Sequence, residues 1–396
     1  MRSWRERAEA VLPTGASTGS KRAAVLYGDE ATDAPTHFVR ANGCRVTDVT
    51  GATFIDCTMA LGSVALGYAD PRVTRAVIDA ASDGNVSGLS SWREVTLAER
   101  LCAVIPCAER VQLVKSGAEA TSAAVRIART YTGRDRVIAC GYFGWHDWSS
   151  DAQGVPASTR REIVRVPFDD VDALEHAARA EGRALTAIVI EPIVERAPSE
   201  AWLVRARALC DELGAALVFD EVKTGFRVAP GGYQEVCGVT PDLASFGKAM
   251  ANGYPLAAIV GTAPLMDAAR RTWISSTLAS ESTALAASLA VLERHDEMDV
   301  CAALSATGRA MRVAVENAIA ATGAHGVRID GIDAMWFLRW DDPAREVRFV
   351  REALRAGVLF KRGAYDFAAL AHDDEALAAI ERAAGTALET LHEDDA

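Results

Sequence analysis

The chain has 396 residues, of which 50% are hydrophobic and 24% are charged, the composition of a globular protein with room for more than one domain. Its formal net charge of -12 argues against nucleic acid or an anionic membrane as the main partner, because both need a concentrated basic surface. Eight scattered cysteines without metal-ligand spacing predict reduced thiols, a cytoplasmic protein and no metal site. We also expect no signal peptide and no membrane span.

Short apolar runs alternate with amphipathic helical segments through the middle of the chain, a pattern typical of an α/β fold with a parallel sheet. Short strands separated by glycines precede this region, and longer helices with a few strands follow it. We therefore expect a large domain over residues 61–290 and a smaller one built from residues 1–60 and 291–396. The predicted strands of the large domain are residues 111–114, 137–140, 187–190, 216–219, 243–246 and 257–260.

The first chemical signal in chain order is Ser116-Gly117-Ala118-Glu119, which follows a predicted strand and has the form of a capping box that opens a helix. Small residues let a phosphate approach the backbone amides at the positive end of a helix dipole. A capped helix without a ligand is the alternative. No dinucleotide or Walker-type glycine loop is present.

Aromatic residues gather directly after the next predicted strand, in the segment 141–148 that contains Phe143. Such a segment at a strand end is a plausible platform for a planar ring, and packing in the core or at a dimer interface is the alternative.

Two further predicted strands end in carboxylates, Glu191 and Asp220. Ligands of parallel α/β sheets bind at the carboxyl ends of the strands. An acid there suits pyridoxal 5'-phosphate, whose pyridine nitrogen must stay protonated for the ring to accept electrons. A helix cap or a magnesium ligand is the alternative for Asp220, and a hydrogen-bonding support is the expected role of Glu191.

Lys248 follows the predicted strand 243–246 and is one of only five lysines in the chain. A Schiff-base lysine needs a fixed and partly desolvated pocket, so that its amine is neutral and nucleophilic. A surface lysine at a strand end is the simpler interpretation of its position alone, but the neighbouring motifs favour the first.

Together these segments resemble the class III (subgroup II) aminotransferases of fold type I, with glutamate-1-semialdehyde aminomutases as the nearest type. The resemblance covers residues 35–372 and is most specific over residues 217–265. It implies a pyridoxal-phosphate enzyme whose large domain has a mostly parallel seven-stranded sheet, beside a smaller α+β domain from both termini. It also implies a homodimer with its active site at the interface, acting on a small-molecule amino donor and a carbonyl acceptor.

The resemblance assigns a role to each matching position. Lys248 would hold the cofactor as a Schiff base and shuttle the proton, while Asp220 would pair with the pyridine nitrogen. The remaining assignments are ring contacts for Val222 and Phe143, phosphate contacts for Ser116, Gly117 and Ala118, a supporting role for Glu191, and a phosphate contact from Thr277 of the opposite subunit.

Differences from the family pattern gather on the substrate side, for example Ala118 and the segments 143–145 and 279–282. They favour an aminotransferase of specialised biosynthesis over an enzyme for glutamate semialdehyde. An aminomutase, racemase or decarboxylase with the same cofactor is the runner-up, and a non-catalytic binding protein is the third alternative.

Overall fold

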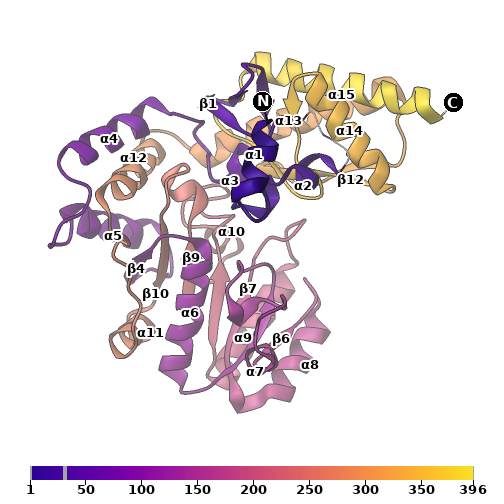
Figure 1. Ribbon diagram of the computed structural model, residues 1–396. Coiled ribbons are helices and arrows are strands. Elements are labelled where there is room, and N and C mark those ends of the chain that lie inside the picture. Colours follow the sequence, from indigo (N-terminus) through magenta and orange to yellow (C-terminus); the bar gives the residue numbers. More distant parts are fainter. Residues whose placement is uncertain (1, 30–33, 396) are drawn as a thin grey trace. The chain divides into compact units, whose positions relative to one another are not determined.

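The computed structural model describes residues 2–29 and 34–395 of the chain, with side chains up to residue 391. It divides into two compact units, one formed by Pro71–Cys301 and the other by Met1–Asp70 with Ala302–Ala396 (Figure 1). These bounds differ from the expected segments 1–60, 61–290 and 291–396. In the described part of the chain no helix is long and apolar enough to cross a membrane.

The larger unit is built on a seven-stranded sheet in which only one strand, β10, runs antiparallel to its neighbours. In spatial order the strands are β4 (Arg110–Val114), β10 (Ala257–Gly261), β9 (Leu243–Phe246), β8 (Ala216–Asp220), β7 (Leu185–Ile190), β5 (Arg136–Cys140) and β6 (Ile163–Arg165). This architecture confirms the predicted fold class. All six predicted strands are present, and the short edge strand β6 is the one that the sequence pattern did not reveal.

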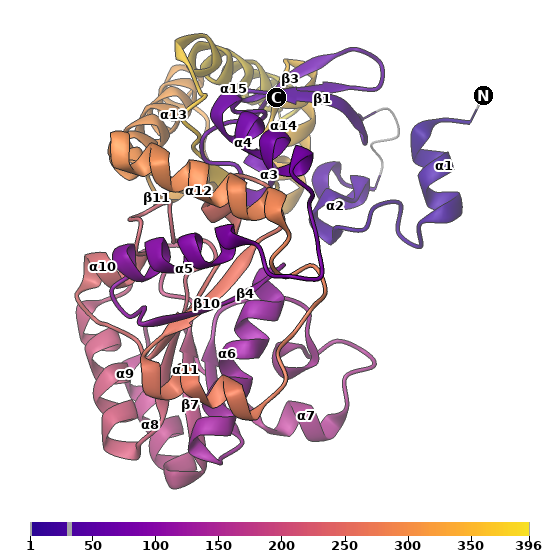
Figure 2. The same ribbon diagram turned by 90° about the vertical axis from the view of Figure 1, so that its left-hand side faces the viewer.

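Helices cover both faces of this sheet, with α6 on one side and α8 and α9 on the other (Figure 2). The helix α6 begins at a capping box between Ser116 and Glu119 and ends at Gly133, whose φ of 67° is the left-handed conformation that glycine favours. The helices of this unit are α4 (Pro71–Ser82), α5 (Trp92–Val104), α6 (Gly117–Thr132), α7 (Ala157–Arg161), α8 (Val171–Glu181), α9 (Glu200–Leu213), α10 (Tyr233–Cys237), α11 (Ala263–Met266) and α12 (Ser282–Glu297).

The smaller unit joins the two ends of the chain through a parallel pair, in which Val358 and Leu359 of β13 lie opposite Ile55 and Asp56 of β3. Its sheets are β1 (Phe38–Asn42), β2 (Arg45–Asp48), β3 (Thr53–Asp56) and β13 (Val358–Leu359), and then β11 (Val327–Ile332), β12 (Met335–Trp340) and β14 (Asp366–Phe367). Its helices are α1 (Trp4–Val11), α2 (Ala23–Tyr27), α3 (Met59–Gly62), most of α13 (Val300–Thr322), α14 (Pro343–Arg355) and α15 (Asp374–Asp395).

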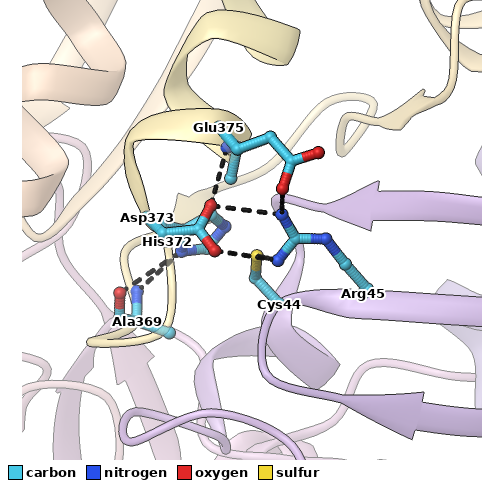
Figure 3. Close-up of polar contacts among 7 residues, drawn as sticks. Cys44, Arg45, Ala369, His372, Asp373 and Glu375 are labelled. Atoms are coloured by element: carbon cyan, nitrogen blue, oxygen red, sulfur yellow. Dashed lines mark hydrogen bonds and ion pairs between the residues drawn. The ribbon is translucent and has the colours of Figure 1, made fainter.

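An ion-pair cluster fastens β2 to the start of α15 within the smaller unit (Figure 3). The Arg45 guanidinium donates to both carboxylate oxygens of Asp373 at 3.1 and 3.2 Å and to Glu375 at 2.9 Å. Asp373 also accepts the Ala376 amide at 2.8 Å, so it caps the helix as well. The three charged side chains are all at least partly exposed, so the cluster is a structural ion-pair network at the surface.

Candidate active site

Three neighbouring strands deliver polar side chains to the carboxyl-end edge of the large sheet. Ile190 of β7 lies opposite Phe219 of β8, so Glu191 and Asp220 follow at the same level of the sheet. Asp220 in turn lies opposite Ser245 of β9, three residues before Lys248. The parallel register therefore brings the predicted acid and the strand that leads to the predicted lysine side by side.

Asp220 is a buried carboxylate that is poised between its two protonation states. Its Oδ1 accepts the Val222 amide at 3.0 Å, which fixes the side chain at the end of β8. Burial, reinforced by the negative charge of Glu191, raises the pKa of Asp220 to about 7. A buried acid in this state gains from a cationic partner, which would stabilise its charged form.

Lys248 begins a short 3-10 turn, η4 (Lys248–Ala251), directly after β9. Its φ of 48° lies in the left-handed region, a strained backbone for a side chain other than glycine and one that recurs at functional sites. Burial, followed by the positive charge of Lys223, lowers the pKa of Lys248 to about 8. Its amine therefore loses its proton around pH 8, well below the range of an ordinary lysine, and the neutral form is the one that a nucleophilic lysine requires.

The start of α6 forms a close-packed wall around Val222. A Cβ on Gly117 would lie 2.9 Å from a methyl group of Val222, and one on Gly247 would lie 3.5 Å from it. The amides of Gly117 and Ala118 stand in the first helical turn, where a helix supplies no acceptor for them. The Ser116 hydroxyl accepts the Glu119 amide at 3.3 Å, so it serves as the cap of the helix.

The aromatic segment packs on this wall, and Phe143 is buried within the segment. Its ring is 2% exposed and lies in the core with its centroid 5.4 Å from that of Trp148. The preceding side chain, Tyr142, is 75% exposed, and its backbone amide donates to Glu191 at 3.2 Å. A Cβ on Gly144 would lie 2.5 Å from the Cβ of Ala118, which holds the segment against the start of α6.

A second buried lysine, missed in the sequence, completes the charged cluster. The Lys223 amine lies 2.6 Å from Oε1 of Glu191, and the two side chains are only 8% and 11% exposed. The turn that carries Lys223 is anchored by Glu221, whose carboxylate accepts the amides of Tyr233 and Gln234 at 2.8 and 3.0 Å. The only available signal was its place three residues after Asp220, in a chain with five lysines.

Thr277 lies apart from this cluster in the same chain. It is exposed and lines a polar cavity of about 630 Å³ with the segment 83–93. None of the residues that line this cavity belongs to the cluster around Lys248 and Asp220.

The residues present fit pyridoxal 5'-phosphate. The cluster offers a deprotonatable amine for its aldehyde, a buried acid for its ring nitrogen, and first-turn amides of a helix for its phosphate. The Ser245 hydroxyl is completely buried next to Asp220 in the sheet and has no hydrogen-bond partner within the described part of the chain. Such an orphaned polar group in a cluster of charges indicates a site built for a further polar molecule.

Comparisons with known proteins agree with this chemistry. The family model "Aminotransferase class-III" matches residues 27–370. The 2'-deamino-2'-hydroxyneamine transaminase of Streptomyces kanamyceticus is 35% identical over 88% of this chain and 89% of its own length. A glutamate-1-semialdehyde 2,1-aminomutase of Neisseria gonorrhoeae (strain NCCP11945) is 32% identical over 93% of this chain and 94% of its own length.

Among solved structures, the PLP internal aldimine form of the FumI protein of Sphingopyxis sp. MTA144 superposes with a TM-score of 0.94 at 28% identity. It covers 99% of this chain and 96% of that protein. The sheet, the charged edge and these relatives together lead to one conclusion. The chain belongs to the class-III aminotransferases, a family of enzymes that depend on pyridoxal 5'-phosphate.

Proposed function

We propose that this aminotransferase uses Lys248 and Asp220 as its catalytic residues and acts on a substrate of specialised biosynthesis. The observation that carries the proposal is that the pKa values of the two groups are shifted in opposite directions. The pKa of the Asp220 carboxyl is raised to about 7, and that of the Lys248 amine is lowered to about 8. Paired groups with pKa values moved toward neutrality are typical of acid-base catalysis.

When bound, pyridoxal 5'-phosphate supplies an electron sink for the bond that breaks at the amino carbon. Lys248 would hold it covalently, and Asp220 would pair with its ring nitrogen and keep a proton there. Val222 and Phe143 would pack on the ring. Gly117 and Ala118 would bind the phosphate through their amides, with Ser116 at the cap of the same helix, while Glu191 would support Asp220 from β7.

Lys248 also moves the proton that the reaction requires. When it is not bonded to the cofactor, the Lys248 amine would be the acid-base group of the site. Because burial lowers its pKa to about 8, this amine could accept a proton from the substrate carbon and give a proton back during the same reaction. Water is restricted at this edge because Asp220 and Glu191 are both buried.

We further propose a homodimer in the cytoplasm, in which Thr277 binds the phosphate of the opposite subunit. Large apolar side chains that line its cavity stay exposed, namely Val86, Leu89 and Trp92, and so does the adjacent Leu278. All eight cysteines are unpaired thiols, as a reducing compartment allows. Light scattering on the purified protein tests for the dimer. A monomeric mass would contradict the proposed contact between Thr277 and the phosphate of the opposite subunit.

A visible spectrum followed by a panel of donors tests the reaction. The protein loaded with pyridoxal 5'-phosphate is expected to lose its visible absorbance when a suitable amine is added, and to recover it with a carbonyl acceptor. The panel includes the compounds that the relatives are named for, 2'-deamino-2'-hydroxyneamine and glutamate-1-semialdehyde. If no amine in the panel changes the visible absorbance of the loaded protein, transamination is contradicted.

Aminomutase chemistry is the second candidate because the Neisseria relative covers 93% of this chain. A racemase or a decarboxylase would begin with the same residues. Solvent deuterium that enters the substrate without release of a keto product would favour this group of reactions over transamination.

A further inference from the structure

The ends of β7 and β8 present an electrostatic conflict. Glu191 and Asp220 stand at the same level of neighbouring parallel strands, which lie about 4.8 Å apart in any sheet. Both carboxylates are buried, and the charge of Glu191 disfavours the charged form of Asp220. Two like charges so placed in a pocket of low dielectric need a cation to remain ionised together.

Lys223 supplies that cation from the turn after β8. Its amine lies 2.6 Å from Oε1 of Glu191, within a charge-assisted hydrogen bond. The other oxygen of Glu191 accepts the Tyr142 amide, and Gly141 approaches so closely that a Cβ there would lie 2.4 Å from the Cβ of Glu191. The carboxylate is therefore held between the aromatic segment and Lys223, beside Asp220 at the end of the neighbouring strand.

We propose that Lys223, through its ion pair with Glu191, is a positioning residue of the catalytic site: it neutralises Glu191, so that Asp220 alone acts as the anion for the cofactor ring, and its positive charge favours the neutral form of the Lys248 amine. The inference rests on the proposed function of Asp220 and Lys248. It goes beyond that function by assigning a task to two residues that need not touch the substrate.

Four charged groups act on Lys248, and their signs support this role. Lys223 and Arg227 lower the pKa of Lys248, whereas Glu191 and Asp220 raise it. Lys223 likewise favours the charged form of Asp220, against the influence of Glu191. Removing one member of the Lys223–Glu191 pair must shift the protonation of Lys248 in one direction, and removing the other must shift it in the opposite direction. A pair that merely fastens the fold would not produce opposite shifts.

The test is a titration of Lys248 in the protein without cofactor. Acetic anhydride acetylates the neutral amine, and mass spectrometry gives the extent of labelling at Lys248 as a function of pH. We expect Lys223→Met to raise the midpoint by about one pH unit, the scale on which one neighbouring charge acts. Glu191→Gln is expected to lower it. The double variant should return close to the original midpoint, and the charge-conserving Lys223→Arg should keep it.

If Lys223→Met does not fold, Lys223→Gln carries the same test, because its amide still donates to Glu191 without a charge. A second readout is the affinity for pyridoxal 5'-phosphate at pH 7, followed by visible absorbance. Lys223→Met should weaken this affinity about tenfold, because the loss of the positive charge should raise the pKa of Asp220 by about one unit. Glu191→Gln should not weaken it. Unchanged midpoints in folded variants, or shifts in the same direction, would overturn the proposal. Because the labelling needs neither cofactor nor turnover, its failure is distinct from a failure of the aminotransferase reaction.

Discussion

Two charged clusters in this protein shift the pKa values of their side chains in opposite senses. In the surface cluster of the smaller unit, the hydrogen bond with Arg45 lowers the pKa of Asp373, and that with Asp373 raises the pKa of Arg45, so both groups are driven toward their charged forms (Figure 3). At the edge of the large sheet, burial raises the pKa of Asp220 and lowers that of Lys248. The first cluster holds its members in their charged forms. In the second, Asp220 and Lys248 are both shifted toward their neutral forms, as expected of groups that act on a cofactor.

Replacement of Lys248 should have the largest effect. Lys248→Met removes the amine that binds the cofactor covalently, so we expect no trapping by borohydride and a loss of turnover larger than about a thousandfold. Lys361→Met is the matched control, because burial also lowers the pKa of Lys361, but its amine donates to the Arg362 carbonyl at 3.0 Å. If trapping were lost in the Lys361 variant and kept in the Lys248 variant, Lys361 and not Lys248 would be the residue that binds the cofactor covalently.

Asp220→Asn should have the second largest effect on catalysis. The amide keeps the shape of the side chain but cannot stabilise a proton on the ring nitrogen, so kcat should fall at least about a hundredfold, the scale of losing one electrostatic partner of a transition state. Circular dichroism checks that the variant is folded. A variant with near-normal kcat would show that another group faces the ring.

The pH dependence of cofactor loading comes next. Because the pKa of Lys248 is lowered to about 8, its amine is protonated below this value and neutral above it. The rate of loading onto the protein without cofactor should rise about tenfold per pH unit below 8 and level off above it. Stopped-flow absorbance measures this rate. A rise that continues toward pH 10 would mean that the lysine is not desolvated.

Gly144→Ala tests the close packing beside the site. The residue has a φ of 89°, and the new Cβ would lie 2.5 Å from that of Ala118. Backbone strain of about 1–2 kcal/mol and overpacking of about 1–3 kcal/mol should both lower the free energy of unfolding, and the affinity for the cofactor should fall. Gly133→Ala is the control, because its φ is also positive but its surroundings are open. Equal losses of stability in chemical denaturation would contradict the close contact.

Asp373→Asn should have the smallest effect. Its partly exposed ion pair with Arg45 is worth at most about 1 kcal/mol of unfolding free energy, and less at high salt. Since the folded-state pKa of Asp373 is depressed, this contribution is present at neutral pH and lost as the pH falls through that pKa. Catalysis should be unchanged in the variant. A loss of turnover would mean that the cluster is more than a structural ion-pair network.

Strands and strand-end acids were predictable because an apolar run that stops at a carboxylate is a local signal. The fold class and the placement of Asp220 follow from it, as does the turn that carries Lys248. The strand β6 escaped because three residues at a sheet edge leave no apolar run.

The rest depends on geometry that the order of residues does not contain. Which of the adjacent residues Tyr142 and Phe143 turns inward is set by the backbone of the segment, beginning with Gly141 at a φ of 132°. The Lys223–Glu191 pair arises only when β7 and β8 align in register, since the two residues lie far apart in the chain.

Borohydride reduction of the protein loaded with pyridoxal 5'-phosphate, followed by peptide mass spectrometry, locates the covalent attachment. We predict a single modified position, Lys248, in the peptide that follows β9. Attachment at Lys223, Lys361 or another amine, with Lys248 unmodified, would contradict the site described above.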